Sequence, residues 1–154
     1  METEYYTPEE SKEIAKRYKD LLRESYQTLS EEDKKLIRKA FDVAVDAHKE
    51  QRRKSGEPYI FHPIAVAKIV AYDIGLDAVS IAAALLHDVV EDTPITIEEI
   101  ARDFGDVIAK IVKGLTKISS LSRDTDVSLQ AENFRKMLLT LNDDVRVILI
   151  KIAD

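Results

Sequence analysis

Hydrophobic residues recur every three or four positions along most of this 154-residue chain, which is the spacing of one face of an amphipathic helix. The pattern predicts about eight helices, and with them an all-α bundle around one hydrophobic core. The expected helices cover residues 7–26, 30–54, 63–70, 78–86, 96–104, 107–117, 129–141 and 145–153.

Capping residues indicate where several of these helices begin. Thr7-Pro8-Glu9-Glu10 combines a cap, a first-turn proline and a capping-box glutamate. Ser30, Asp77 and Thr96 are placed to cap three further helices. The helix at 78–86 is apolar on nearly every side, so we expect it to lie buried at the centre of the bundle.

Two segments depart from this regular pattern. Residues 118–128 are rich in Ser and Asp, and we expect them to form a long loop and the most mobile internal segment. The last helix is strongly apolar and stops at Asp154 without a glycine cap or a polar tail. This ending favours the interpretation that the chain is a fragment of a longer protein.

Composition limits the chemistry that the chain can carry. The residues are 45% hydrophobic and 34% charged, with four glycines and four prolines, which is typical of a single packed helical domain. Without cysteine, a metal ion would be held by His, Asp or Glu. The net charge of -6 argues against a general nucleic-acid surface. No apolar run approaches the ~18 residues of a membrane span, so we expect a cytoplasmic protein.

Four ionisable residues gather at the end of the buried helix. His87 and Asp88 are adjacent, and Glu91 and Asp92 follow four residues after each, so a continuous helix would stack the two pairs on neighbouring faces. Buried carboxylates need a partner, and a divalent metal would supply one. The alternative is that the helix has reached the surface by Asp88 and that its acids are solvated.

Two distant residues favour the metal interpretation. His62 lies between an apolar segment and a helix start, where a neutral imidazole is preferred, and Asp154 follows a strongly apolar run. Two imidazoles and two carboxylates suit a manganese, iron or zinc centre that is open to water and phosphate. His48 falls on the apolar face of its helix, so we interpret it as a core histidine instead.

The separated His62, His87-Asp88 and Asp154 resemble the pattern of the HD phosphohydrolase superfamily. More specifically, the runs Arg53-Lys-Ser-Gly-Glu-Pro-Tyr-Ile-Phe-His62-Pro63, Ala-Leu-Leu-His87-Asp-Val-Val-Glu-Asp92 and Val-Ile-Leu-Ile-Lys-Ile-Ala-Asp154 are similar to the N-terminal hydrolase domain of long RelA/SpoT-type enzymes. The similarity extends from about Ala40 to Asp154. It implies an HD-type helical bundle over residues 1–154, with residues 1–28 as a helix packed on it and synthetase and regulatory domains downstream.

The resemblance also implies an activity and a set of site residues. The expected reaction is Mn²⁺-dependent removal of the 3′-pyrophosphate from guanosine alarmones, ppGpp or pppGpp. Neither a nucleic acid nor a membrane is an expected partner. Three groups of residues are implied: His62, His87, Asp88 and Asp154 as Mn²⁺ ligands, Glu91 and Asp92 as the residues that position and deprotonate water, and Arg53, Lys54, Ser55 and Tyr59 as nucleotide contacts.

Two other functions stay open at this point. One is an HD phosphohydrolase that acts on a different nucleotide. The other is a catalytically silent HD module that regulates an attached domain, against which the intact Glu91 and Asp92 argue. The basic cluster at residues 52–54 could likewise be a solvated last turn of the second helix.

Overall fold

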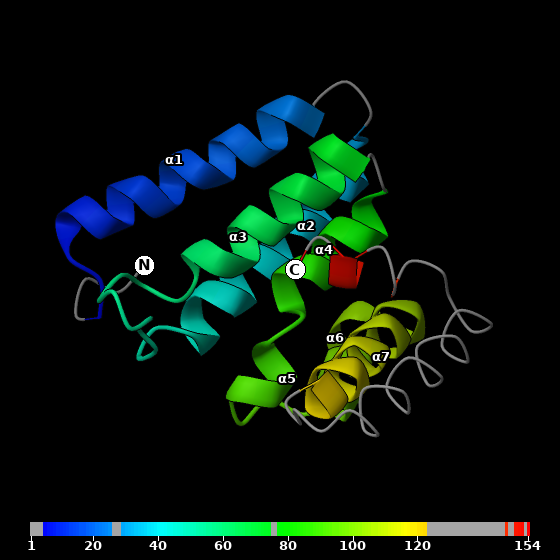
Figure 1. Ribbon diagram of the computed structural model, residues 1–154. Coiled ribbons are helices and arrows are strands. Elements are labelled where there is room, and N and C mark those ends of the chain that lie inside the picture. Colours follow the sequence, from blue (N-terminus) through cyan, green and yellow to red (C-terminus); the bar gives the residue numbers. More distant parts are fainter. Residues whose placement is uncertain (1–4, 26–28, 75–76, 123–146, 148–149, 153) are drawn as a thin grey trace.

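The computed structural model describes residues 5–25, 29–74, 77–122, 147, 150–152 and 154 (Figure 1). Over these residues the regular elements are helices, and Arg52 and Pro58 form an isolated antiparallel bridge. The all-α prediction is therefore confirmed. The elements are α1 (Pro8–Ser25), α2 (Glu31–Ala47), α3 (Phe61–Lys68), the π-helix η2 (Ile69–Ile74), α4 (Ala78–Leu86), α5 (Val89–Asp92), α6 (Ile97–Phe104) and α7 (Asp106–Ser122).

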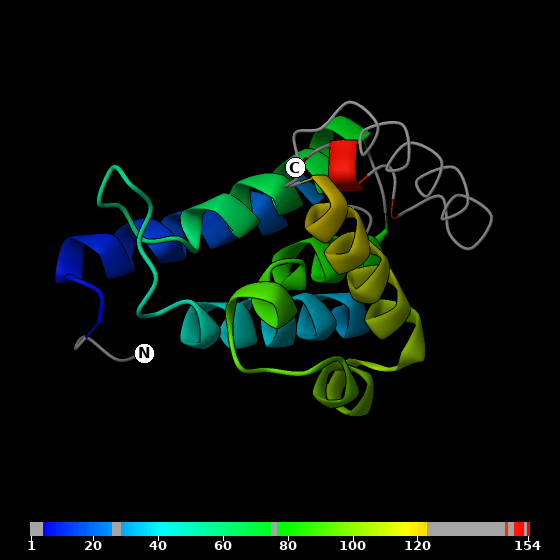
Figure 2. The same cartoon turned by 60° about the horizontal axis from the view of Figure 1, so that its bottom comes forward.

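Helix α4 is the centre of the bundle, as its apolar sequence predicts. It packs against α2, α3, η2 and α7, and it lies among these elements in both views of the molecule (Figures 1 and 2). Residues 82–86 of α4 are completely buried. Three of these five are alanines, whose small side chains let the neighbouring helices approach closely. The C-terminal end of α4 is therefore surrounded by packed side chains.

The predicted caps are present at the starts of the helices. Ser30 and Asp33 form a reciprocal capping box, and the Asp77 side chain accepts a hydrogen bond from the backbone of Ser80. Thr96 accepts from the backbone N–H of Glu99 at the start of α6. These local hydrogen bonds satisfy N–H groups that a helix cannot satisfy itself. None of the described helices is long and apolar enough to cross a membrane.

The second helix ends earlier than predicted. It stops at Ala47 rather than at residue 54, and residues 51–60 form a folded loop between α2 and α3. The loop turns at Gly56, whose φ of 93° favours glycine. Arg52 fixes the loop to the start of α1, because its guanidinium donates to both carboxylate oxygens of Glu10 and to the carbonyl of Tyr5. These long-range contacts outweigh the local helical tendency.

The loop predicted at residues 118–128 is also partly wrong. Helix α7 continues to Ser122. Its earlier turns bury their apolar side against α4 and α6, and a helix that is stabilised in this way extends further at little cost. Residues 123–128, which are the rest of the expected mobile segment, lie outside the described residues. So does the helix expected at 129–141. Of the helix expected at 145–153, Val147 and residues 150–152 are helical in the structure.

Close contact between α7 and the last helix suggests a stability test. A β-carbon added at Gly114 would lie 3.1 Å from Cγ2 of Val147. We expect Gly114→Leu to lower the free energy of unfolding by about 1 to 3 kcal/mol, because the added side chain must displace Val147. Urea denaturation measures this change. Lys113→Leu, at the exposed neighbouring position, is the control, and an equal loss in both variants would contradict the packing role of Gly114.

The buried His48 provides a second test, based on pH. Burial lowers the pKa of His48 below its ordinary value of 6.5, although the hydrogen bond with Gln51 opposes the shift. Below that pH the unfolded chain binds a proton that the folded chain does not, so His48 reduces stability as the solution becomes acidic. Urea unfolding at about pH 7.5 and about pH 5.5 should show wild type losing more stability than His48→Leu. A parallel loss would show that His48 does not titrate in this way.

Candidate metal centre

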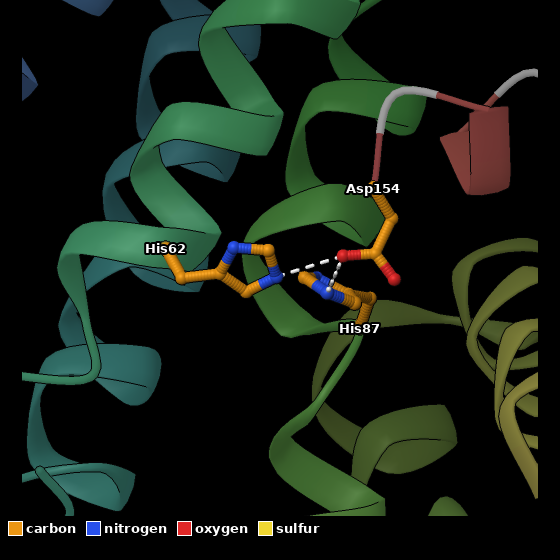
Figure 3. Close-up of side chains that lie close together, drawn as sticks. All are labelled: His62, His87 and Asp154. Atoms are coloured by element: carbon orange, nitrogen blue, oxygen red, sulfur yellow. Dashed lines mark hydrogen bonds and ion pairs between the residues drawn. The ribbon is translucent and has the colours of Figure 1, made fainter. Parts of the chain in front are cut away.

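Side chains from three distant parts of the chain meet beside the end of α4. His62 lies in the first turn of α3, His87 follows the last residue of α4, and Asp154 lies just after the helical residues 150–152 (Figure 3). The Nε2 atoms of His62 and His87 lie 2.7 Å and 3.2 Å from Oδ1 of Asp154. The three residues offer ligand atoms within 4.8 Å of one another.

Asp88 adds a second carboxylate to this group. Its Oδ2 lies 3.0 Å from Nε2 of His87 and 3.9 Å from Nε2 of His62. The helix is interrupted here, because Asp88 has φ -99° and ψ -3° and acts as the N-cap of α5. The expected continuous stacking of residues 87, 88, 91 and 92 on one helix is therefore wrong. The interruption instead lets adjacent residues, His87 and Asp88, turn toward the same point.

The orientation of His87 is fixed from behind. Its Nδ1 lies 2.6 Å from the carbonyl oxygen of Ala84, which can only accept, so Nδ1 carries the hydrogen and donates. Nε2 then faces Asp88 and Asp154. A histidine that ligates a metal through one nitrogen commonly donates its other N–H to a carbonyl in this way, because the contact holds the ring and its tautomer.

Burial makes this cluster electrostatically demanding. The side chain of His87 is 2% exposed and that of Asp154 is 14% exposed. Burial alone would lower the pKa of His87, but its hydrogen bonds to Asp154 and Asp88 raise it well above the ordinary value. Burial alone would raise the pKa of both carboxyl groups, but the bonds from the histidines lower it. The donors around them keep the two carboxylates ionised in this buried position, and Nζ of Lys151 lies 3.1 Å from Oδ2 of Asp154 as one of these donors.

A divalent metal ion fits this arrangement. Ligand atoms that lie about 2.1 Å from one ion stand roughly 3 Å apart, which is the scale of the separations found here. Two imidazole nitrogens and two carboxylate oxygens form a mixed donor set suited to manganese, iron or zinc. A hydrogen on Nε2 of His87 would point at these carboxylates, and a bound ion would take the place of that hydrogen.

The remaining predicted site residues lie around this cluster. Tyr59 belongs to the loop at residues 51–60. Its hydroxyl donates to Oδ2 of Asp88, a candidate ligand carboxylate. Arg53 lies with its guanidinium carbon 5.9 Å from the centre of the Tyr59 ring. Lys54 and Ser55 are exposed beside it. The predicted nucleotide contacts thus occupy one loop, residues 51–60, next to the candidate metal site.

Glu91 and Asp92 lie in the short helix α5, after the interruption. Glu91 is half-buried and Asp92 is exposed. Among the described residues, neither belongs to the candidate metal group. Asp92 instead accepts a hydrogen bond from the side chain of Gln51. Of the two carboxylates, Asp88 is therefore buried and paired, whereas Asp92 faces solvent.

Sequence reasoning missed one polar contact of this region. Gln51 was predicted to lie in the basic end of the second helix, and His48 to be a core histidine, which its complete burial confirms. The side chains of these two residues meet, and Gln51 continues to Asp92. The spacing of three residues between His48 and Gln51 on an assumed helix could have indicated that their side chains meet. Nothing in the sequence indicated that Gln51 also contacts Asp92.

Comparison with known proteins gives the family. The HD domain family matches residues 40–154. A probable guanosine-3′,5′-bis(diphosphate) 3′-pyrophosphohydrolase of Synechocystis sp. is 53% identical over 119 residues, which cover 77% of this chain and 16% of that protein. The bifunctional (p)ppGpp synthase/hydrolase SpoT of Escherichia coli strain K12 is 50% identical over 126 residues, covering 82% of this chain and 18% of SpoT.

A third relative shows the same relation of lengths. The GTP pyrophosphokinase rsh of Brucella melitensis is 49% identical over 119 residues, covering 77% of this chain and 16% of the relative. The chain therefore spans less than a fifth of the length of these curated relatives. The family match extends over the candidate metal centre, from α2 to Asp154, and on this match the chain belongs to the HD domain family.

Proposed function

We propose that this domain hydrolyses the 3′-pyrophosphate of guanosine alarmones, and so converts ppGpp or pppGpp to GDP or GTP and pyrophosphate. The observation that carries the proposal is the convergence of His62, His87, Asp88 and Asp154 on one point, in a chain about half identical to proteins named for this reaction. A cluster of this donor set next to a basic loop suits a substrate that carries several phosphates.

We further propose Mn²⁺ as the ion that these four residues hold. A bound divalent ion would lower the pKa of its water and neutralise phosphate charge. The chain's own contribution is to keep the four ligand atoms close together and to exclude solvent from behind them. The bonds from His87 to Ala84 and from Tyr59 to Asp88 support this role, because each holds a proposed ligand in one orientation.

Glu91 and Asp92 are the proposed proton acceptors. In the reaction, the oxygen of water bonds to the phosphorus attached to the 3′ oxygen, and one proton of the water passes to a carboxylate. The bond between that phosphorus and the 3′ oxygen breaks, and the 3′ oxygen takes up a proton to become a hydroxyl, while the carboxylate returns its proton to solvent. A carboxylate suits this task when it lies near the reacting centre without being a metal ligand. Both residues follow Asp88 within four positions and stand outside the candidate metal group.

Arg53, Lys54, Ser55 and Tyr59 are the proposed nucleotide contacts. A guanidinium can stack on a base and also carry charge toward a phosphate, whereas a lysine offers a compact positive charge. All four residues belong to the loop at residues 51–60, which is tied to α1 through Arg52 and Glu10. The backbone N–H of Arg53 donates to the carbonyl of Glu57, and that of Gly56 donates to the carbonyl of Arg53, so the loop backbone needs little ordering when an anionic ligand binds.

We propose that residues 1–154 are part of a longer protein, with synthetase and regulatory domains downstream of the hydrolase domain. The lengths of the relatives support this, since the chain covers 16% to 18% of each. The bifunctional name of one relative supports a synthetase activity on the longer protein. The cytoplasm, where guanosine nucleotides are found, is the proposed location.

One assay tests the proposed function directly. Purified chain and Mn²⁺ are incubated with ppGpp, and pyrophosphate and GDP are measured together. Equal amounts of the two products are expected. Release of inorganic phosphate instead, or hydrolysis of other nucleotides only, would identify an HD phosphohydrolase with a different substrate. Metal and ppGpp binding without any product would favour the silent regulatory module and contradict the proposal.

The proposed ligands predict the effect of removing one of them. We expect His87→Ala and Asp88→Ala to abolish measurable Mn²⁺ binding, because each variant removes one of the four proposed donors. Isothermal titration calorimetry with Mn²⁺ gives the measurement. Asp42→Ala, which removes an exposed carboxylate on α2, is the control and should bind like wild type. Unchanged binding in the His87 variant would show that the ion sits elsewhere.

A different result is expected for Glu91→Gln. This variant should bind Mn²⁺ with wild-type affinity, but its turnover number should fall by roughly 10² or more, because the attacking water loses a proton acceptor. Titration calorimetry and pyrophosphate release measure the two quantities on the same protein. Weaker Mn²⁺ binding in Glu91→Gln, with an unchanged turnover number at saturating metal, would make Glu91 a ligand instead.

A further inference from the structure

A short series of side-chain hydrogen bonds connects the interior of the bundle with α5. Nδ1 of His48 lies 2.8 Å from Oε1 of Gln51, and Nε2 of Gln51 lies 3.3 Å from Oδ2 of Asp92. Three elements are joined in this way: the C-terminal end of α2, the loop at residues 51–60, and α5. None of the three side chains belongs to the candidate metal group.

The chemistry of the groups fixes the direction of each hydrogen bond. A carboxylate such as that of Asp92 only accepts, so the amide NH₂ of Gln51 faces it and donates. The amide oxygen of Gln51 then faces His48 and accepts, which requires a hydrogen on Nδ1 of His48. Donation therefore runs in one direction, from His48 to Gln51 and from Gln51 to Asp92.

His48 is a rigid starting point for this series. Its side chain is fully buried, its ring centre lies 5.0 Å from that of Tyr59, and its backbone N–H caps α2 by donating to Ala44. Its Nε2 is buried and makes no hydrogen bond with a described residue. A hydrogen on Nε2 would thus be a buried donor without an acceptor, while Nδ1 would face the oxygen of Gln51 with a lone pair. Both effects favour the neutral tautomer with its hydrogen on Nδ1.

Gln51 is equally constrained through its backbone. Its N–H donates to the carbonyl of His48 over 2.9 Å, and its own carbonyl accepts from the N–H of Tyr59 over 3.0 Å. The side chain of Gln51 therefore leaves a fixed backbone and is held at its oxygen by His48. Asp92, in contrast, is exposed and lies in the last position of a four-residue helix, where its side chain has few packing constraints.

We propose that Gln51, held by His48, is a positioning residue that orients Asp92 for proton transfer. The inference rests on the proposed function, in which Asp92 helps to accept the proton of the attacking water. The side-chain amide of Gln51 donates to Oδ2 of Asp92. This hydrogen bond restricts rotation of the carboxylate and leaves Oδ1 to accept the proton of the water. Loss of the bond leaves the metal ligands and the nucleotide loop in place but lets the proton acceptor leave its reactive orientation.

The kinetic test uses Gln51→Met, which keeps the side-chain length and removes both hydrogen bonds. We expect its turnover number for ppGpp hydrolysis to fall roughly tenfold or more, with KM and Mn²⁺ affinity unchanged. The neighbouring exposed Glu50→Met is the matched control and should behave like wild type. A normal turnover number in Gln51→Met, or a change in KM alone, would overturn the proposal.

A double-mutant comparison then asks whether Gln51 acts through Asp92. The same Gln51→Met change is made in an Asp92→Ala background, where it should have no further effect on the turnover number. A merely structural role for Gln51 would lower the turnover number by the same factor in both backgrounds. That result would overturn the proposal.

A spectroscopic measurement on the metal-free chain tests the hydrogen bonds without any activity. A long-range ¹H–¹⁵N spectrum of the histidines should show His48 with its hydrogen on Nδ1 in wild type, and a shift of the tautomer equilibrium in Gln51→Met. A hydrogen on Nε2 of wild-type His48 would overturn the proposal. If wild type releases no pyrophosphate, the proposed function fails, and the tautomer of His48 still decides whether the hydrogen-bonded series exists.

Discussion

Burial of α4 is the constraint on which the rest of the structure depends. This nine-residue helix carries no charged side chain, and it contacts α2, α3 and α7 at once. Its apolar surface can be removed from water only at the centre of the bundle. The next residues, His87 and Asp88, therefore lie in a largely buried position. The other features of the candidate site follow from the need to provide hydrogen-bond and charge partners for these two side chains.

Charges placed at a buried position must be neutralised by partners from elsewhere. His62 from α3 and Asp154, which follows the last helical residues, meet His87 and Asp88 at one point, so that imidazoles alternate with carboxylates. The close approach of Val147 to Gly114 brings the last helix against α7 and helps to place Asp154. The cluster thus ties α3 and the end of α4 to the C-terminal end of the family match, and a bound cation would strengthen the same connection.

The loop at residues 51–60 connects the metal cluster to the outside of the domain. Through Arg52 it is fixed to α1, through Tyr59 it supports Asp88, and through Gln51 it reaches Asp92. The exposed Arg53 lies on the same loop. A single loop therefore contacts the candidate ligand carboxylate and the proposed proton acceptor, and it also carries the proposed nucleotide contacts. These three tasks explain why so many polar side chains are concentrated within ten residues.

The sequence by itself determined the helical class, the capped starts of α2, α4 and α6, the burial of α4, and the residue types offered for a metal. These features depend on apolar spacing and on hydrogen bonds between residues three positions apart, which local sequence contains. Only the tertiary structure decided that α2 ends at Ala47 and that Gln51 joins His48 to Asp92. It also shows the contact between His62 and Asp154, which the family resemblance, and not the spacing of apolar residues, leads one to expect. The reason is physical: those outcomes depend on which distant side chains share a buried space, and periodicity along the chain carries no information about such neighbours.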